Sequence, residues 1–168
     1  MFLDRDGTLN VKAPEGAYVR EPEDLVLLPG AARALARLNR AGVETVLVTN
    51  QRWLSGADAD PARYRATHAR LVDLLAEHGA HLDHAYHCPH AAGSCDCRKP
   101  LPGLLVRAAR EHGLDLCGAV IVGDAASDVA AGRAAGVRSI RLAPRPDPEA
   151  DATVPDLASA VPLLLPRH

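Results

Sequence analysis

Apolar and polar positions along this chain follow two periodicities that replace each other at intervals. Short strand-like runs, apolar or rich in residues that favour strands, lie at residues 1–3, 44–48, 84–88, 119–122 and 138–142. Longer segments space their apolar residues three and four apart, which predicts helices, and they lie at residues 30–42, 62–79, 104–113 and 127–136. Residues 156–161 are the last segment of this alternating pattern of strands and helices.

Strands that alternate with helices predict an α/β fold, a Rossmann-like parallel sheet with helices on both faces. We expect one domain over residues 1–168, since no internal repeat or linker interrupts the pattern. Residues 10–29 predict an irregular excursion over a pocket mouth, and residues 143–155, rich in Pro and Asp, a surface loop. The intervals between the strand ends hold no large cap domain.

Polar residues follow the strand-like runs, and ligands of parallel sheets bind beyond the carboxyl ends of the strands. These residues are Asp4 with Asp6, Thr49 with Asn50, Arg98 with Lys99, and Asp124 with Asp128. Carboxylates from two strand ends suit Mg²⁺, and one of a pair can act as nucleophile and the other as general acid and base. The Thr hydroxyl and Asn amide offer phosphate contacts. Alone, an Asp-x-Asp pair more often marks a simple turn, and Asp128 equally suits a helix N-terminus.

A second cluster contains Cys88, His90, Cys95 and Cys97. Three thiolates and one imidazole complete a tetrahedral zinc site, and a full ligand set indicates a structural metal. Free thiols or a disulfide are the alternative, and a reducing compartment disfavours the disulfide. Zinc would fix the loop that leads to Arg98 and Lys99. The Arg guanidinium can donate two parallel hydrogen bonds to a phosphate, and the Lys ammonium supplies a compact positive charge.

Charge and composition narrow the function further. The net charge of −2 argues against a general nucleic-acid or membrane-surface binder. No signal peptide and no membrane-spanning stretch is visible, so we expect a cytoplasmic protein. Arginine greatly outnumbers lysine, which draws attention to the two lysines, Lys12 and Lys99.

Four stretches, taken in order, resemble the haloacid dehalogenase superfamily of phosphotransferases. They are FLDRDGTLN, VTNQ, CPH…CDCRKPLPG and VGDAASDVAAGRAAGV, and they span roughly residues 2–142. Within that superfamily they look like the branch of heptose bisphosphate and histidinol-phosphate phosphatases. The Cys and His cluster joined to Arg-Lys-Pro is the most diagnostic part.

This resemblance implies a Mg²⁺-dependent phosphatase with a phosphoaspartate intermediate. It implies that Asp4 attacks phosphorus and that Asp6 protonates the leaving group and then activates water. Mg²⁺ would be held by Asp4, by the backbone carbonyl of Asp6 and by Asp124. The sequence pattern itself, apart from the resemblance, allows Asp128 a supporting role behind these ligands. Thr49 and Lys99 would bind the transferring phosphoryl group, and Arg98 would contact the substrate. Phosphoryl transfer needs mainly positioning and neutralisation of charge, which suits this set.

The chain departs from the resemblance after VTNQ, where Arg52 and Trp53 replace small turn residues. At a pocket rim, Arg52 could meet a second phosphate and Trp53 could cover a sugar. Alternatively, Trp53 packs under the excursion. Only three residues precede Asp4, a short first strand that allows a few native N-terminal residues to be missing.

We therefore expect a carbohydrate-metabolism hydrolase that acts on a small phosphorylated metabolite, most simply a sugar (heptose) bisphosphate. A histidinol-phosphate phosphatase and a polynucleotide 3′-phosphatase are alternatives, the latter disfavoured by charge and few aromatics. A non-catalytic zinc-stabilised binding module is less favoured, since Asp4, Asp6, Lys99 and Asp124 are all present.

Overall fold

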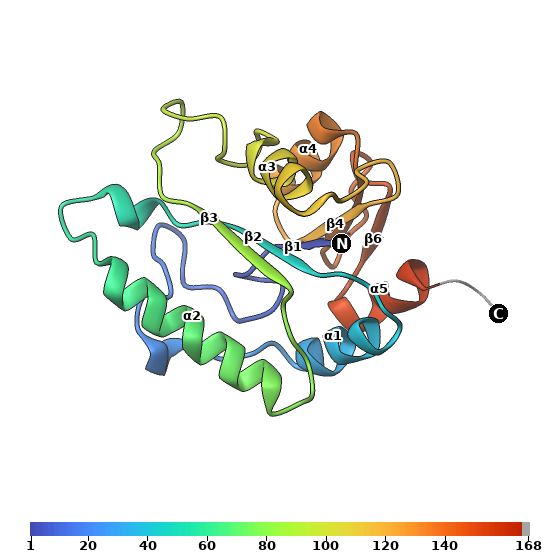
Figure 1. Cartoon of the computed structure of the whole chain (residues 1–168), viewed down its shortest axis with the longest axis horizontal. Coiled ribbons are helices and arrows are strands. Elements are labelled where there is room, and N and C mark those ends of the chain that lie inside the picture. Colours follow the sequence, from blue (N-terminus) through green and yellow to red (C-terminus); the bar gives the residue numbers. More distant parts are fainter. Residues whose placement is uncertain (166–168) are drawn as a thin grey trace.

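A computed structural model describes residues 1–165 as helices packed on both faces of a six-stranded sheet (Figure 1). The strands are β1 (Phe2–Leu3), β2 (Val46–Asn50), β3 (His84–Cys88), β4 (Val120–Gly123), β5 (Arg138–Leu142) and β6 (Ala152–Val154). Their order is β3-β2-β1-β4-β5-β6, and neighbouring strands run parallel. The α/β fold with a parallel sheet is confirmed.

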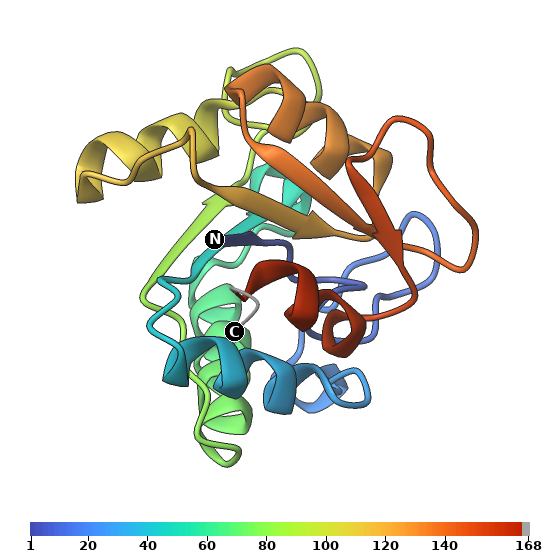
Figure 2. The same ribbon diagram turned by 90° about the vertical axis from the view of Figure 1, so that its right-hand side faces the viewer.

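Within residues 1–165, four α-helices and two 3-10 helices lie between the strands in the chain, and a fifth α-helix follows the last strand. They are η1 (Pro22–Asp24), α1 (Ala31–Arg40), η2 (Arg52–Ser55), α2 (Pro61–Ala76), α3 (Gly103–His112), α4 (Ala126–Ala135) and α5 (Leu157–Leu164). Helices α1, α2 and α5 lie against one face of the sheet and α3 and α4 against the other, as both views show (Figure 2). No helix within residues 1–165 is long and apolar enough to cross a membrane.

Alternate residues of the central strands supply two separate cores. In β1, Leu3 packs into the core under α1, α2 and α5, whereas Phe2 packs into the core under α3 and α4. In β2, Leu47 faces the first core and Val48 the second. Strands buried on both faces read as continuous apolar runs, and this explains why the sequence pattern identifies them. The carboxyl ends of β1, β2 and β4 are thereby fixed side by side.

The last strand was not expected. Residues 143–155 were predicted to be a surface loop, but Ala152–Val154 form β6, which pairs in parallel with β5. As an edge strand of three residues with one neighbour, β6 buries little, so it leaves no apolar run in the sequence. β6 lies at the opposite edge of the sheet from β3, the strand that leads into the predicted zinc ligands.

Candidate functional site

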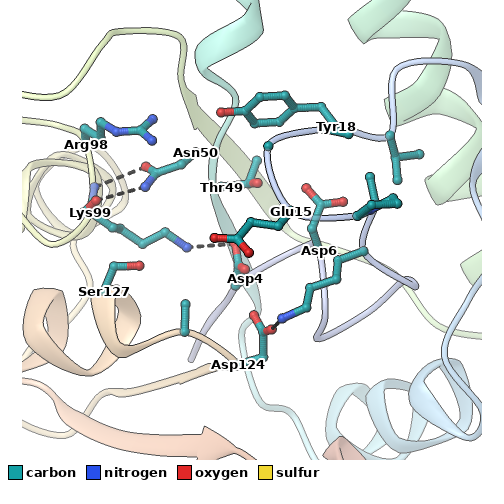
Figure 3. A pocket seen from close by; sticks show the side chains of 17 residues that line it. Asp4, Asp6, Glu15, Tyr18, Thr49, Asn50, Arg98, Lys99, Asp124 and Ser127 are labelled. Carbon is teal, nitrogen blue, oxygen red and sulfur yellow. Dashed lines mark hydrogen bonds and ion pairs between the residues drawn. The ribbon is translucent and has the colours of Figure 1, made fainter.

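A cavity of about 510 Å³ opens at the carboxyl ends of the central strands (Figure 3). Residues 12–19 of the excursion form one of its walls, as the sequence predicts. The residues predicted from the strand ends converge here, and the lining includes Asp4, Asp6, Thr49, Asn50, Arg98, Lys99 and Asp124. The fold thus collects polar groups from four separate turns into one open site.

Asp4 lies at the floor of this cavity, directly after β1. Its backbone N–H donates to the carbonyl of Val122 in β4 at 3.0 Å, which continues the sheet by one residue. The residue is buried, and the Lys99 ammonium donates to its Oδ1 at 2.7 Å. Burial raises the pKa of Asp4 to about 7, against the opposing charge of Lys99. Additional positive charge at this site would favour the ionised, nucleophilic form.

Lys99 is a buried cation shared between two carboxylates. Its Nζ lies 2.7 Å from Asp4 Oδ1 and 2.6 Å from Asp128 Oδ1, and it donates to the carbonyl of Val48 at 2.8 Å. Burial by itself lowers the pKa of Lys99, but the charges of Asp4 and Asp128 outweigh that effect and raise the pKa. The ammonium therefore stays charged at neutral pH and holds the floor of the cavity together.

Asn50, predicted to contact phosphate, lines the cavity and also holds the backbone of Lys99. Its Nδ2 donates to the Lys99 carbonyl at 2.9 Å, and its Oδ1 accepts from the Lys99 N–H at 3.1 Å (Figure 3). Both polar atoms of the Asn50 amide thus form hydrogen bonds with the backbone of Lys99. Thr49, one residue earlier, keeps a buried hydroxyl on the cavity wall.

The carboxylates fit a hard cation. Oxygens of Asp4, Asp124 and Asp128 lie within 4.8 Å of one another, and oxygen ligands of this kind suit Mg²⁺. Asp128 also accepts the backbone N–H of Ala125 at 3.0 Å, which ties it to the start of α4. On the solvent side, Lys12 Nζ pairs with Asp124 Oδ2 at 2.5 Å. The negative charge of the clustered carboxylates thus already attracts the ammonium of Lys12.

The turn after Asp4 requires a glycine. Gly7 has a φ of 86°, a left-handed conformation that other residues rarely adopt. A Cβ at this position would also lie 2.4 Å from Cγ of Asp124. The turn therefore approaches Asp124 so closely that only a residue without a side chain fits.

The four predicted zinc ligands form a second cluster. Cys88 is the last residue of β3, and the other three lie in the loop that joins β3 to α3, which Figure 1 shows. Cys88 Sγ lies 3.6 Å from Cys95 Sγ, 3.2 Å from Cys97 Sγ and 3.6 Å from His90 Nδ1. His90 Nδ1 lies 3.3 Å from Cys97 Sγ. A tetrahedron with Zn–S bonds of about 2.3 Å has edges of about 3.8 Å, so the donor set is close to the size that zinc requires.

Two predicted rim residues lie elsewhere. Trp53 is 4% exposed, and Arg20 of the excursion lies over its ring at 5.3 Å, so the interpretation of Trp53 as a sugar-covering rim residue is wrong and the packing alternative holds. Arg52 is exposed and, among residues 1–165, does not belong to the cavity lining. Its predicted contact with a second phosphate therefore has no geometric support.

Several lining residues were not identified from the sequence, namely Lys12, Glu15, Tyr18 and Ser127. Lys12 carried a signal, since it is one of only two lysines in an arginine-rich chain. Glu15 and Tyr18 belong to the excursion, where no periodicity indicates which side chains face the cavity. Lys12 and Glu15 thus place one positive and one negative charge on the excursion side of the cavity.

Comparisons with known proteins show the family of this chain. The family model of haloacid dehalogenase-like hydrolases matches residues 2–136. A D-glycero-beta-D-manno-heptose-1,7-bisphosphate 7-phosphatase of Pseudomonas aeruginosa is 34% identical over 174 residues, covering 98% of this chain and 97% of the relative. A D-glycero-D-manno-heptose-1,7-bisphosphate 7-phosphatase of Thermosynechococcus vestitus is 42% identical over 159 residues, covering 83% and 76%.

Solved structures give the same grouping. The crystal structure of D,D-heptose 1,7-bisphosphate phosphatase from B. bronchiseptica, complexed with magnesium and phosphate, matches with a TM-score of 0.87 and 36% identity, covering 98% of this chain and 96% of that one. The corresponding phosphatase from Burkholderia thailandensis matches with a TM-score of 0.71 and 26% identity, covering 99% and 97%.

Proposed function

The chain belongs to the haloacid dehalogenase-like hydrolases, and from this premise we propose that it is a Mg²⁺-dependent phosphatase of a heptose bisphosphate. One observation carries the proposal: the buried Asp4 carboxylate meets the Lys99 ammonium at 2.7 Å in an open cavity that Asp124 also lines. A nucleophile, a phosphoryl-binding cation and a metal ligand thus share one site. The names of the similar proteins supply the substrate class.

The residues at the cavity floor divide the work of binding. Asp4, Asp124 and the backbone carbonyl of Asp6 would hold Mg²⁺, which supplies positive charge that neutralises and orients the phosphoryl oxygens. Lys99 and the Thr49 hydroxyl bind the same phosphoryl group from the side of β2. Asp128 keeps Lys99 charged and in place, because its Oδ1 lies 2.6 Å from Nζ.

The reaction then proceeds in two displacements. An Asp4 oxygen attacks phosphorus, the bond from phosphorus to the sugar oxygen breaks, and Asp6 gives its proton to the departing oxygen. In the second step water attacks the phosphoaspartate at phosphorus, Asp6 takes the proton of that water, and inorganic phosphate leaves while Asp4 is restored. The two carboxylates thus have separate tasks, nucleophile and acid–base catalyst.

The second phosphate of a bisphosphate needs positive charge away from the floor. Arg98 and Lys12 both line the cavity, on its zinc-loop side and on its excursion side respectively. An open cavity of about 510 Å³ accommodates a sugar with a phosphate at each end. We assign Arg98 to substrate binding for this reason.

A structural zinc completes the proposal. Cys88, His90, Cys95 and Cys97 would hold it, and the loop that they close leads directly to Arg98 and Lys99. The Arg98 Nη1 also reaches back to the carbonyl of His90 at 3.4 Å. Zinc thereby fixes the position of two cations that the substrate requires.

Phosphate release from synthetic heptose 1,7-bisphosphate tests the function. We expect release that depends on Mg²⁺, with ³¹P NMR showing the loss of one phosphate and the retention of the other. The corresponding 7-monophosphate and histidinol phosphate are the comparison substrates. A higher kcat/KM for either monophosphate would remove the bisphosphate from the proposal while leaving a phosphatase.

A further inference from the structure

Gln51 is a buried residue whose amide contacts the proposed acid–base catalyst. Its side chain is inaccessible to solvent, and its Nε2 donates to Asp6 Oδ2 and to Thr49 Oγ1, each at 2.9 Å. Its Oε1 accepts from the indole Nε1–H of Trp53 at 2.9 Å. Each polar atom of the amide thus has a partner, and two of the partners line the cavity.

Trp53 decides which way the Gln51 amide faces. The indole N–H only donates, so it requires the amide oxygen on its side and places the NH₂ group toward Asp6 and Thr49. A flipped amide would set NH₂ against the indole N–H and a carbonyl oxygen against the Asp6 carboxylate. Both contacts of the flipped amide would be repulsive. Because Gln51 is fully buried, neither its NH₂ group nor its carbonyl oxygen could bond to water instead.

The indole is itself held firmly. Trp53 lies in η2, is 4% exposed, and has the guanidinium of Arg20 at 5.3 Å from its ring centre. Arg20 belongs to the excursion, and its carbonyl accepts the hydroxyl of Thr67 in α2 at 2.6 Å. The excursion thus covers the indole, so its N–H direction is determined by the fold.

Two other residues also donate hydrogen bonds to Asp6. Arg5 Nη2 lies 3.0 Å from both carboxylate oxygens, and Asn10 Nδ2 donates to Oδ1 at 2.9 Å. Both belong to the turn that carries Asp6 itself, whereas Gln51 comes from the end of β2. Gln51 is therefore the contact that fixes the Asp6 carboxylate relative to the strand carrying Thr49.

We propose that Gln51, with its amide orientation set by Trp53, is a positioning residue that aims the Asp6 carboxyl group at the leaving-group oxygen. This inference rests on the proposed function. A general acid accelerates bond cleavage only when its proton is held within hydrogen-bond distance of the departing oxygen. Losing the Trp53–Gln51 contact leaves Asp6 held by Arg5 and Asn10 of its own turn, but no longer held in direction by the residue that follows β2.

Leaving-group dependence separates this role from a structural one. Phenoxide, whose conjugate acid has a pKa of about 10 like that of tyrosine, needs a proton as it departs, whereas the more acidic nitrophenol leaves with little help. The value of kcat/KM reports the steps through phosphoryl transfer to Asp4. The test is therefore the ratio of kcat/KM for phenyl phosphate to that for 4-nitrophenyl phosphate.

Trp53→Phe removes the indole N–H and retains an aromatic ring. We expect its ratio to fall roughly tenfold, a part of the about 10²–10⁴-fold that general acid catalysis contributes. Gln51→Met, of similar length and without donors, should show the same selective fall. Ser55→Ala is the matched control: it removes the hydroxyl that donates to the Arg52 carbonyl at 2.9 Å in the same short helix, and its ratio should equal that of the wild type.

A second readout does not depend on catalysis. Trp53 is the only tryptophan, so a ¹H–¹⁵N spectrum contains a single indole N–H signal. In Gln51→Met this signal should shift, and its hydrogen exchange should accelerate. An unchanged indole signal, or losses of kcat/KM that are equal for both esters in Trp53→Phe and Gln51→Met, would overturn the inference. A wild-type protein that releases phosphate from no ester would instead refute the proposed function.

Discussion

Replacing Lys99 by Met removes the positive charge that Asp4 and Asp128 share at the cavity floor. The ammonium lies 2.7 Å from Asp4 and 2.6 Å from Asp128, and its side chain is 2% exposed. Met retains similar length, so two buried carboxylates lose their common counter-charge with little change in packing. Removing one partner of a buried pair costs about 3–5 kcal/mol, and a domain of this size loses about 2–4 °C per kcal/mol, so we expect a fall in Tm of roughly 6–20 °C.

The size of this effect should depend on pH. Burial raises the pKa of Asp4 from 3.8 to about 7 with Lys99 present, and removing Lys99 raises the pKa of this carboxyl further. Between the unfolded-state and the folded-state pKa of such a carboxyl group, stability falls as the pH rises, because only the unfolded state releases the proton. Below about pH 7 this loss is the same in both proteins, so the deficit of Lys99→Met should grow as the pH rises through about 7, where Asp4 ionises in the folded wild type but stays protonated in the folded variant.

Thermal unfolding followed by circular dichroism measures this at about pH 5 and about pH 8. The buffer should contain neither added Mg²⁺ nor a chelator, because a chelator would also remove zinc. Lys12→Met is the matched control, since Lys12 pairs with Asp124 but has a side chain that is 65% exposed. Exposed ion pairs contribute about 0–1 kcal/mol, so its Tm should change little. A Tm of Lys99→Met close to that of the wild type at both pH values would refute the reasoning.

The remaining predictions concern the zinc loop and the Asp4 turn. Purified protein should carry about one zinc per chain by metal analysis. Cys97→Ser should lose the metal and unfold at a lower temperature, because metal binding and folding of the loop are coupled. A Cys97→Ser protein with full zinc content would contradict the assigned ligands. Gly7→Ala should lose activity and about 1–3 kcal/mol of unfolding free energy in denaturant titrations, from its φ of 86° and the contact of its methyl group with Asp124. Gly42→Ala separates the two causes, because Gly42 has a φ of 76° but no atom within 4 Å of its Cβ, so it should cost only the backbone strain and leave phosphate release intact.

The sequence predicts those parts of the fold and site that depend on short-range patterns. Buried strands leave apolar runs, and the polar residue after each run, such as Asp4 or Asp124, must then lie at the carboxyl edge of the sheet. The spacing of Cys88, His90, Cys95 and Cys97 likewise predicts that they meet. The short edge strand β6 leaves no such pattern, because only one neighbour and little burial define it.

Side-chain partners that come from distant segments are a different matter. Asn50 faces the backbone of Lys99, 49 residues further on, and no local pattern shows that its amide is already engaged. Trp53 reads as a rim residue beside the VTNQ stretch, yet the excursion covers it through Arg20. Whether an indole is exposed or buried depends on a chain segment without periodicity, and the sequence could only state both alternatives.

The central claim is that Asp4 becomes phosphorylated during turnover. Mass spectrometry of protein quenched in acid while it hydrolyses heptose 1,7-bisphosphate tests it most directly. The account predicts an acid-trapped phosphoryl group on the N-terminal peptide that contains Asp4, and no phosphoryl group in Asp4→Asn, which should also release no phosphate. Continued phosphate release by Asp4→Asn, with no phosphoryl group on that peptide in either protein, would contradict it.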